Sequence, residues 1–259
     1  MGHFYMGIMW LRDIRWRVLA VLVVMILSPQ LAHAEKRKLL VGSFQDVTVY
    51  GDMQVNIVTG KGSSASATGD RRILDFLRLE RDSEHLVIRV QTPTTDDNKI
   101  RVKEPLIISL STSQIRNISV SGNAKIRVSK VAHDNVSRII MDGGGSIEIG
   151  AIKTDKLQVA ITGTGRVNIG AGSARETSLR IQGAGSFDAS NMQVRKFQLE
   201  QNGNADVAVR VEESATISNV GAGRITVNGN AECFIRKAGS AIITCPQDKK
   251  STVIVPKAK

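Results

Sequence analysis

"ITGTGRVNIG" at residues 161–170 places two glycines inside an otherwise regular strand pattern. Ile161, Val167 and Ile169 alternate with polar residues, as they do in a strand with one buried face. Glycine inside a strand usually marks a bend or the close approach of another backbone. The two glycines therefore predict a corner between two strand segments.

This stretch is one of seven similar stretches. The pattern G-x-[GA]-x-[IVF] recurs with 21, 20, 20, 20, 18 and 18 residues between successive first glycines. The residues four before, four after and six after each first glycine are apolar, and the residue two after it is glycine or alanine. Because side chains of a strand alternate between its two faces, all these positions lie on one face. The first glycines are Gly122, Gly143, Gly163, Gly183, Gly203, Gly221 and Gly239.

The regular spacing predicts coils that stack on one another, because one coil cannot bury its own apolar face. We predict an all-β fold, a right-handed parallel β-helix or β-solenoid with about seven regular rungs of 18–21 residues. The small residues would occupy an inner corner. An antiparallel sandwich of short hairpins would explain the glycines as turn residues, but not the fixed parity of the apolar positions. Further apolar residues predict a short additional side; these are Val131, Ile152, Met192 and Val211.

Opposite charges also recur one rung apart on the outward face. If the rungs stack, each pair lies side by side on the surface and stabilises the stack by about 0.2–1 kcal/mol. The predicted pairs are Arg127 with Glu148, Arg180 with Glu200, and Asp206 with Arg224.

The first 34 residues have the layout of a secretory signal peptide. Arginines precede an apolar run at 18–27, and Ala32-His33-Ala34 follows as a cleavage site. The run is too short to span a bilayer of ~30 Å. We therefore expect cleavage between Ala34 and Glu35, no transmembrane anchor in the mature chain, and export to the periplasm or cell surface of a bacterium. The translation start is left open between Met1, Met6 and Met9.

The remaining chain divides into three regions. Residues 35–115 are predicted to form irregular N-terminal β coils of the same domain, with a separate small β-domain as the alternative. Within them, "VTVYGDMQVNI" at 47–57 repeats the corner layout around Gly51, although Met53 replaces the small residue. Residues 116–247 hold the regular repeats, and residues 248–259 form a basic C-terminal tail.

The two cysteines lie symmetrically about the last corner. Cys233 is six residues before Gly239 and Cys245 six after it, so both have inward parity. In an exported protein this placement predicts a disulfide across the last rung. Two packed free thiols are the alternative.

No catalytic constellation emerges from the residue pattern. Glycoside cleavage needs paired carboxylates, and only Asp188 and Asp206 come near a diagonal pair. His85 and His133 lack a ligand-like spacing, so we predict no metal site and no cofactor. Nucleic acid is a poor fit despite the net charge of +11, because no basic and aromatic stripe is present.

Polar residues on either side of the corners form a candidate binding surface. Such hydroxyl and amide side chains suit a glycan or another protein, or they are simply solvated. The rows are Ser121, Asp142, Thr162, Gln182 and Asn202 before the glycines, and Asn123, Thr164, Asn204 and Ser240 after them.

The layout resembles an exported bacterial family, the putative auto-transporter adhesin, head GIN domain. The matching stretches are "FQDVTVYGDMQVNI" at 44–57 and the corners from "SGNAKI" to "AGSAII", which together cover about 44–245. The resemblance implies a parallel β-helix and a role in adhesion at the cell envelope. The acid often found at the corners of the family is kept here only at Asp206.

These observations favour an exported, non-catalytic, adhesin-like binding or scaffold protein of the cell envelope. Its expected partner is an envelope protein or a glycan. The alternatives are a carbohydrate-active enzyme, either a polysaccharide lyase or a hydrolase, and a structural protein that forms homo-oligomers.

Overall fold

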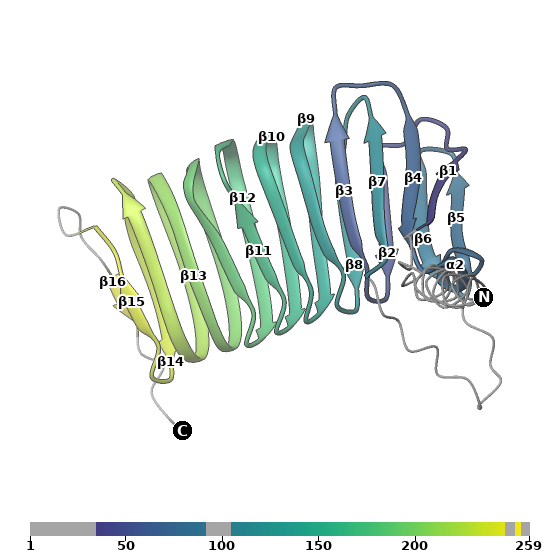
Figure 1. Ribbon diagram of the computed structural model, residues 1–259. Helices are drawn as coiled ribbons and strands as arrows, with labels where there is room; N and C mark the ends of the chain where they lie inside the picture. The colour runs from purple at the N-terminus through teal and green to yellow at the C-terminus, as the bar shows by residue number, and fades with distance from the viewer. Residues whose placement is uncertain (1–34, 92–104, 247–251, 255–259) are drawn as a thin grey trace, which may run out of the picture. The chain divides into compact units, whose positions relative to one another are not determined.

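The computed structural model of the protein describes residues 35–91, 105–246 and 252–254. Within these residues the chain is almost entirely β-strand and is wound into stacked coils (Figure 1). The predicted signal peptide, the cleavage site after Ala34 and most of the basic tail lie outside the described residues.

The coils stack in parallel and in register. Ile147 pairs with Ile126 of the preceding coil and with Val167 of the following one. This parallel pairing confirms the predicted β-solenoid and excludes the antiparallel sandwich. The strands of the regular part are β8 (Asn117–Ser121), β9 (Lys125–Gly143), β10 (Ser146–Gly163), β11 (Arg166–Ile169), β12 (Gly172–Gly183), β13 (Ser186–Gly229), β14 (Glu232–Ala238) and β15 (Ile242–Thr244).

The two glycines of the corner at 163–165 have different structural roles. Gly163 has a φ of +101°, and a Cβ built on it would lie 2.7 Å from the carbonyl oxygen of Gly143 in the preceding coil. A Cβ on Gly165 would instead lie 2.4 Å from Cγ of Met141. The first glycine therefore permits the backbone turn and the close stacking of corners, and the second leaves room for a core side chain.

The inward positions form a continuous dry core. The side chains four before and four after the corner glycines are buried in every coil except the last, where Ile243 is half-buried and packs against the core. The residues predicted for an additional side are buried as well: Val131, Ile152, Met192 and Val211.

The N-terminal coils stack in an order that differs from their order in the chain. Strands β2 (Asp46–Tyr50) and β3 (Gln54–Thr59) form a coil around Gly51 that pairs with β8 and β9. On its other side this coil pairs in parallel with β6 (His85–Val90) and β7 (Ile107–Thr112), which come later in the chain. The strands of the described residues 35–91 and 105–115 therefore extend the same stack.

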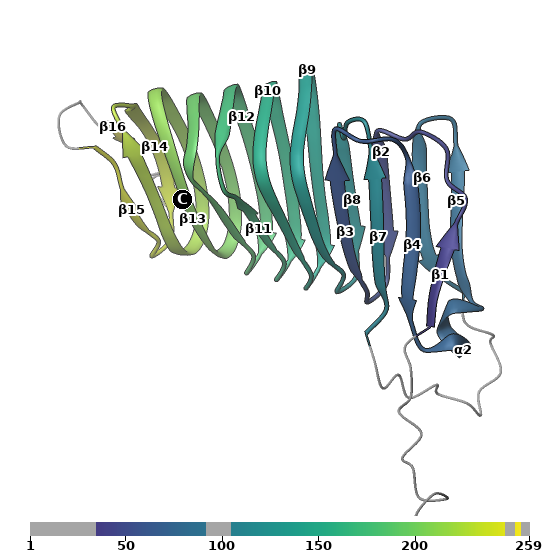
Figure 2. The same ribbon diagram turned by 45° about the horizontal axis from the view of Figure 1, so that its top comes forward.

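Antiparallel strands close this end of the stack (Figure 2). Strand β4 (Ser64–Gly69) pairs with β7, and β1 (Glu35–Leu39) pairs with β4. Strand β5 (Leu77–Asp82) pairs with β6 after the short helix α2 (Arg71–Leu74). At the other end, β16 (Thr252–Ile254) pairs with β14.

Cys233 and Cys245 form the predicted disulfide. Cys233 is buried in β14, and Cys245 lies half-buried just after β15. The bond closes the last coil on itself.

Two of the three predicted ion pairs are present. Arg127 Nε lies 2.9 Å from Glu148 Oε2, and Arg180 Nη2 lies 2.7 Å from Glu200 Oε2. Asp206 differs, because its carboxylate accepts a hydrogen bond from the backbone N–H of Arg224.

Candidate binding surface

The segment before each corner glycine presents its alternate side chains outward, and we name this surface the leading face. Its segments stack in parallel register, as in the pairing of Gln158 with Arg138 on one side and Ser178 on the other. The leading face comprises the outward side chains of 117–121, 138–142, 158–162, 178–182, 198–202, 216–220 and 234–238.

Three adjoining depressions lie on the leading face, with volumes of about 250, 540 and 330 Å³, and the second extends past its border to Lys156, Glu176 and Lys196. The first and second share Gln158 and Ser178, and the second and third share Gln198 and Thr216. Because the depressions share their walls, they form one shallow, elongated groove across successive coils. We call it the leading-face groove.

One row of exposed side chains follows the groove, five residues before each corner glycine. Amides and hydroxyls dominate this row, and both types donate and accept hydrogen bonds. Arg138 at one end donates from Nε to Oε1 of Gln158 at 2.9 Å, and the ring of Phe234 at the other end is 43% exposed. The row consists of Arg138, Gln158, Ser178, Gln198, Thr216 and Phe234.

The carboxylates of the groove are paired with cations. Glu200 pairs with Arg180, and Lys156 Nζ lies 3.3 Å from Glu176 Oε2. The pKa of Glu176 is lowered, chiefly by the hydrogen bond from Lys156 and further by Arg175. Within the part of the chain that the structure describes, three lining cations have no ion pair: Arg138, Lys196 and Arg236.

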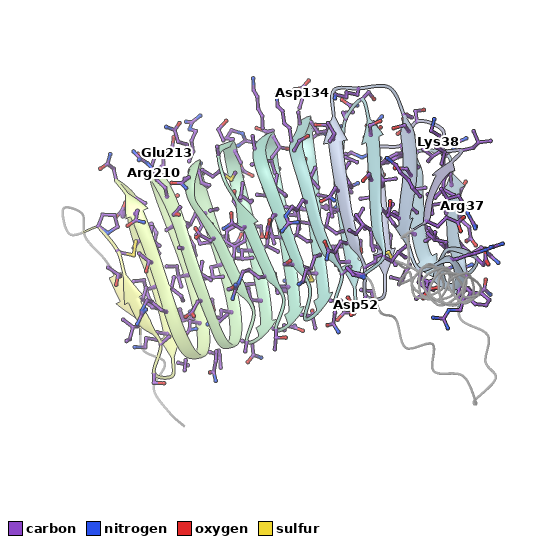
Figure 3. The ribbon with its side chains drawn as sticks, viewed as in Figure 1. Arg37, Lys38, Asp52, Asp134, Arg210 and Glu213 are labelled. Atoms are coloured by element: carbon purple, nitrogen blue, oxygen red, sulfur yellow. A yellow bond between two sulfur atoms is a disulfide. The ribbon has the colours of Figure 1, made fainter. Side chains whose placement is uncertain are left out.

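A fourth depression, of about 360 Å³, lies on another edge of the stack, and four of its lining charges take part in ion pairs: Asp155, Arg175, Arg195 and Glu212. Arg175 donates two hydrogen bonds to Asp155, at 2.7 and 2.9 Å, and this interaction lowers the pKa of Asp155. Figure 3 shows Asp134, Arg210 and Glu213 along this edge, opposite Asp52, which follows Gly51. Among the described residues, the lining charges without an ion pair are Asp134 and Lys153, which are opposite in sign, so this depression has no excess of one charge to attract a ligand.

The structure places the predicted polar rows beside the groove rather than in it. Ser121, Asp142 and Thr162 do stack in register just before the corner glycines. The central row of the groove lies four residues before these polar residues on each segment, that is, five residues before the corner glycine. Sequence reasoning missed that row, although its signal was present in the amide and hydroxyl residues five before each glycine.

The residues considered for catalysis or metal binding form hydrogen bonds with nearby residues in the structure. Asp188 accepts hydrogen bonds from the backbone N–H and the hydroxyl of Ser190, at 3.0 and 2.7 Å. His85 Nε2 lies 2.8 Å from the Thr48 hydroxyl, and His133 Nδ1 accepts from the N–H of Asn135. Among the described residues, no three His, Cys, Asp or Glu side chains are grouped to hold a metal ion.

Across 35–91, 105–246 and 252–254, no helix has the length and apolarity needed to cross a membrane.

The fold and this surface define a class of protein, a parallel β-solenoid that presents an elongated side-chain surface across its repeats. More specifically, the chain belongs to the family described as putative auto-transporter adhesin, head GIN domain, whose sequence model matches residues 43–231. The match confirms the resemblance drawn from the corner pattern.

Solved structures of proteins from Bacteroides and Parabacteroides share the fold. A putative adhesin from Bacteroides fragilis is 20% identical with a TM-score of 0.70, and the match covers 85% of this chain and 95% of that one. A putative lipid binding protein from Parabacteroides distasonis is 16% identical, with a TM-score of 0.58 and coverage of 87% and 98%. A putative adhesin from Parabacteroides merdae is 18% identical, with a TM-score of 0.57 and coverage of 86% and 96%. No curated protein matches the chain.

Proposed function

We propose that this protein is an exported, non-catalytic, adhesin-like binding protein of the bacterial cell envelope. The observation that carries the proposal is the leading-face groove, which continues over several coils instead of forming one closed pocket. An enzyme concentrates its reacting groups in one cleft, whereas a repeated shallow surface suits an extended partner. Export rests on the signal-peptide pattern of residues 1–34.

The family and the fold support a binding role. The family description and two of the solved relatives carry the word adhesin, and another relative is described as a putative lipid binding protein. The local hydrogen bonds of Asp188 and Asp206 support a non-catalytic role, because each carboxylate already accepts hydrogen bonds from a neighbouring residue.

Blocking the groove tests the proposal. Ser178→Trp places a large ring in the middle of the groove, and Asn168→Trp makes a similar change at an exposed position on the segment after a corner glycine. We expect Ser178→Trp to lower retention of the protein on isolated cell envelopes at least tenfold, with Asn168→Trp within twofold of wild type. Equal retention of both variants would exclude the groove as the binding surface. Release of soluble sugar from the envelopes would indicate an enzyme instead.

A further inference from the structure

We infer that the ligand of the leading-face groove is a linear anionic polysaccharide that lies along the stack, across the coils. This inference rests on the proposed function and adds the chemistry of the ligand. It is carried by the length of the groove, by its charge and by the uncharged row between its cations.

The groove has the length of a chain segment rather than of a single sugar. Its central row extends from Arg138 to Phe234 over six successive coils. Five steps of ~4.8 Å give a length of about 24 Å. A ligand that fills the groove must therefore be elongated and must run perpendicular to the strands.

The charge of the groove favours a polyanion. Its lining holds five cations and two carboxylates, so three positive charges are in excess. Both carboxylates are paired within the groove, which leaves cations to face a ligand. The cations are Arg138, Lys156, Arg180, Lys196 and Arg236, and the carboxylates are Glu176 and Glu200.

The spacing of the unpaired cations favours a polysaccharide over a nucleic acid as the ligand. Lys196 lies three coils from Arg138 and two coils from Arg236, which corresponds to about 14 and 10 Å measured along the stack. A nucleic acid strand carries one phosphate per ~3.4 Å along the helix axis, far more densely than these cations. A polysaccharide with a carboxylate only on some of its sugars matches the wider spacing.

The uncharged row fits the rest of such a ligand. Gln158, Ser178, Gln198 and Thr216 lie between the cations and are exposed. Their amides and hydroxyls can donate to and accept from sugar hydroxyls. Phe234 at one end offers an apolar ring face against which a sugar ring can pack.

Binding of partly methyl-esterified polygalacturonate, which carries a carboxylate on only some of its sugars, by the full exported chain tests the inference and is measured by calorimetry. We expect binding that weakens as salt rises, and at least tenfold weaker binding of the fully methyl-esterified polymer, which keeps the sugars and lacks the charge. Polyglutamate tests whether charge without sugar suffices, and vesicles of phosphatidylglycerol test a lipid surface. Binding of either as tightly as polygalacturonate would overturn the inference.

Matched variants locate the binding. The triple variant Arg138→Gln, Lys196→Gln and Arg236→Gln removes the unpaired cations of the groove, and we expect at least a tenfold loss of affinity. The control variant Lys125→Gln, Arg166→Gln and Arg224→Gln removes the same charge from exposed positions after the corner glycines, and we expect less than a threefold change. Equal losses would show nonspecific attraction and overturn the inference. If Ser178→Trp abolishes envelope retention while polygalacturonate fails to bind, the ligand class is wrong and the proposed function stands.

Discussion

The side-chain amide of Gln201 donates a hydrogen bond to the backbone carbonyl of Ala222 in the next coil, at 2.9 Å. Gln201 is only 3% exposed and occupies an inward column that is apolar in the earlier coils. Its amide thereby ties two corners together inside the core. The column, two residues before each corner glycine, consists of Val120, Met141, Ile161, Ile181, Gln201, Asn219 and Lys237.

Two members of this column have buried polar atoms without a partner among the described residues: Gln201 at its Oε1 only, and Asn219 at both polar atoms of its side chain. Asn219 is 1% exposed, and neither its Oδ1 nor its Nδ2 has a hydrogen-bond partner among the described residues. An unpaired buried amide costs about 1–3 kcal/mol, so Asn219→Ile should raise the free energy of unfolding by a similar amount. Urea unfolding measures the change. Asn202→Ile at an exposed position is the control and should change stability by less than about 0.5 kcal/mol. A less stable Asn219→Ile variant would show that the amide is satisfied in solution.

The stack could be predicted because its cause is local and repeats. Each copy of the corner pattern begins with a glycine of positive φ that lies against the backbone of the preceding corner, as Gly163 does, and has glycine or alanine two residues later. Because every coil repeats these constraints, they appear as a period in the sequence. The disulfide could be predicted from the alternation of side chains alone, because Cys233 and Cys245 both point inward, on either side of one corner.

The remaining features depend on contacts that have no period. The coil of β2 and β3 lies between two coils that follow it in the chain, and no local pattern encodes such an insertion. The groove depends on which outward side chains are small, such as Ala160 and Ser218, and therefore on three neighbouring coils at once. Similarly, the alternation of side chains predicts that Asp206 and Arg224 are neighbours. It does not predict whether the carboxylate binds the guanidinium or, as in the structure, the backbone N–H of Arg224.

Removal of the disulfide should loosen the last coil. Cys233→Ala with Cys245→Ala opens a loop of 12 residues, for which the chain-entropy model gives about 3 kcal/mol. We expect a loss of 2–3 kcal/mol in the free energy of unfolding on that basis, and hydrogen exchange should be fastest in β14 and β15. Reducing agent should destabilise the wild type and leave the double variant unchanged. Two reactive thiols in the folded, oxidised wild type would contradict the bond.

Acid should weaken the charged edge around Arg175. The pKa of Asp155 is lowered by its hydrogen bonds from Arg175, and the pKa of Glu176 by Lys156 and Arg175. A carboxylate with a lowered pKa in the folded state stabilises the fold above its unfolded pKa, and that contribution is lost as pH falls through the folded value. Stability should therefore drop below about pH 4, and Arg175→Gln should flatten this part of the curve. Arg166→Gln, whose Nε donates to the Ser186 hydroxyl, should keep the shape of the wild-type curve.

Three glycine-to-alanine variants separate backbone strain from close stacking. Gly62 has no neighbour near a built Cβ and no positive φ, so Gly62→Ala should leave stability unchanged or slightly higher. Gly51 has a φ of +102° and open space, so Gly51→Ala should cost only the backbone strain, on the order of 1–3 kcal/mol. At Gly183, φ is +119° and a Cβ would lie 2.5 Å from the carbonyl oxygen of Gly163. Gly183→Ala should therefore lower the free energy of unfolding by ~1–3 kcal/mol more than Gly51→Ala does. Urea unfolding of the three variants measures the order. Equal losses at Gly51 and Gly183 would mean that the corners tolerate wider spacing, and the stack would then be held by its core and strand pairing alone.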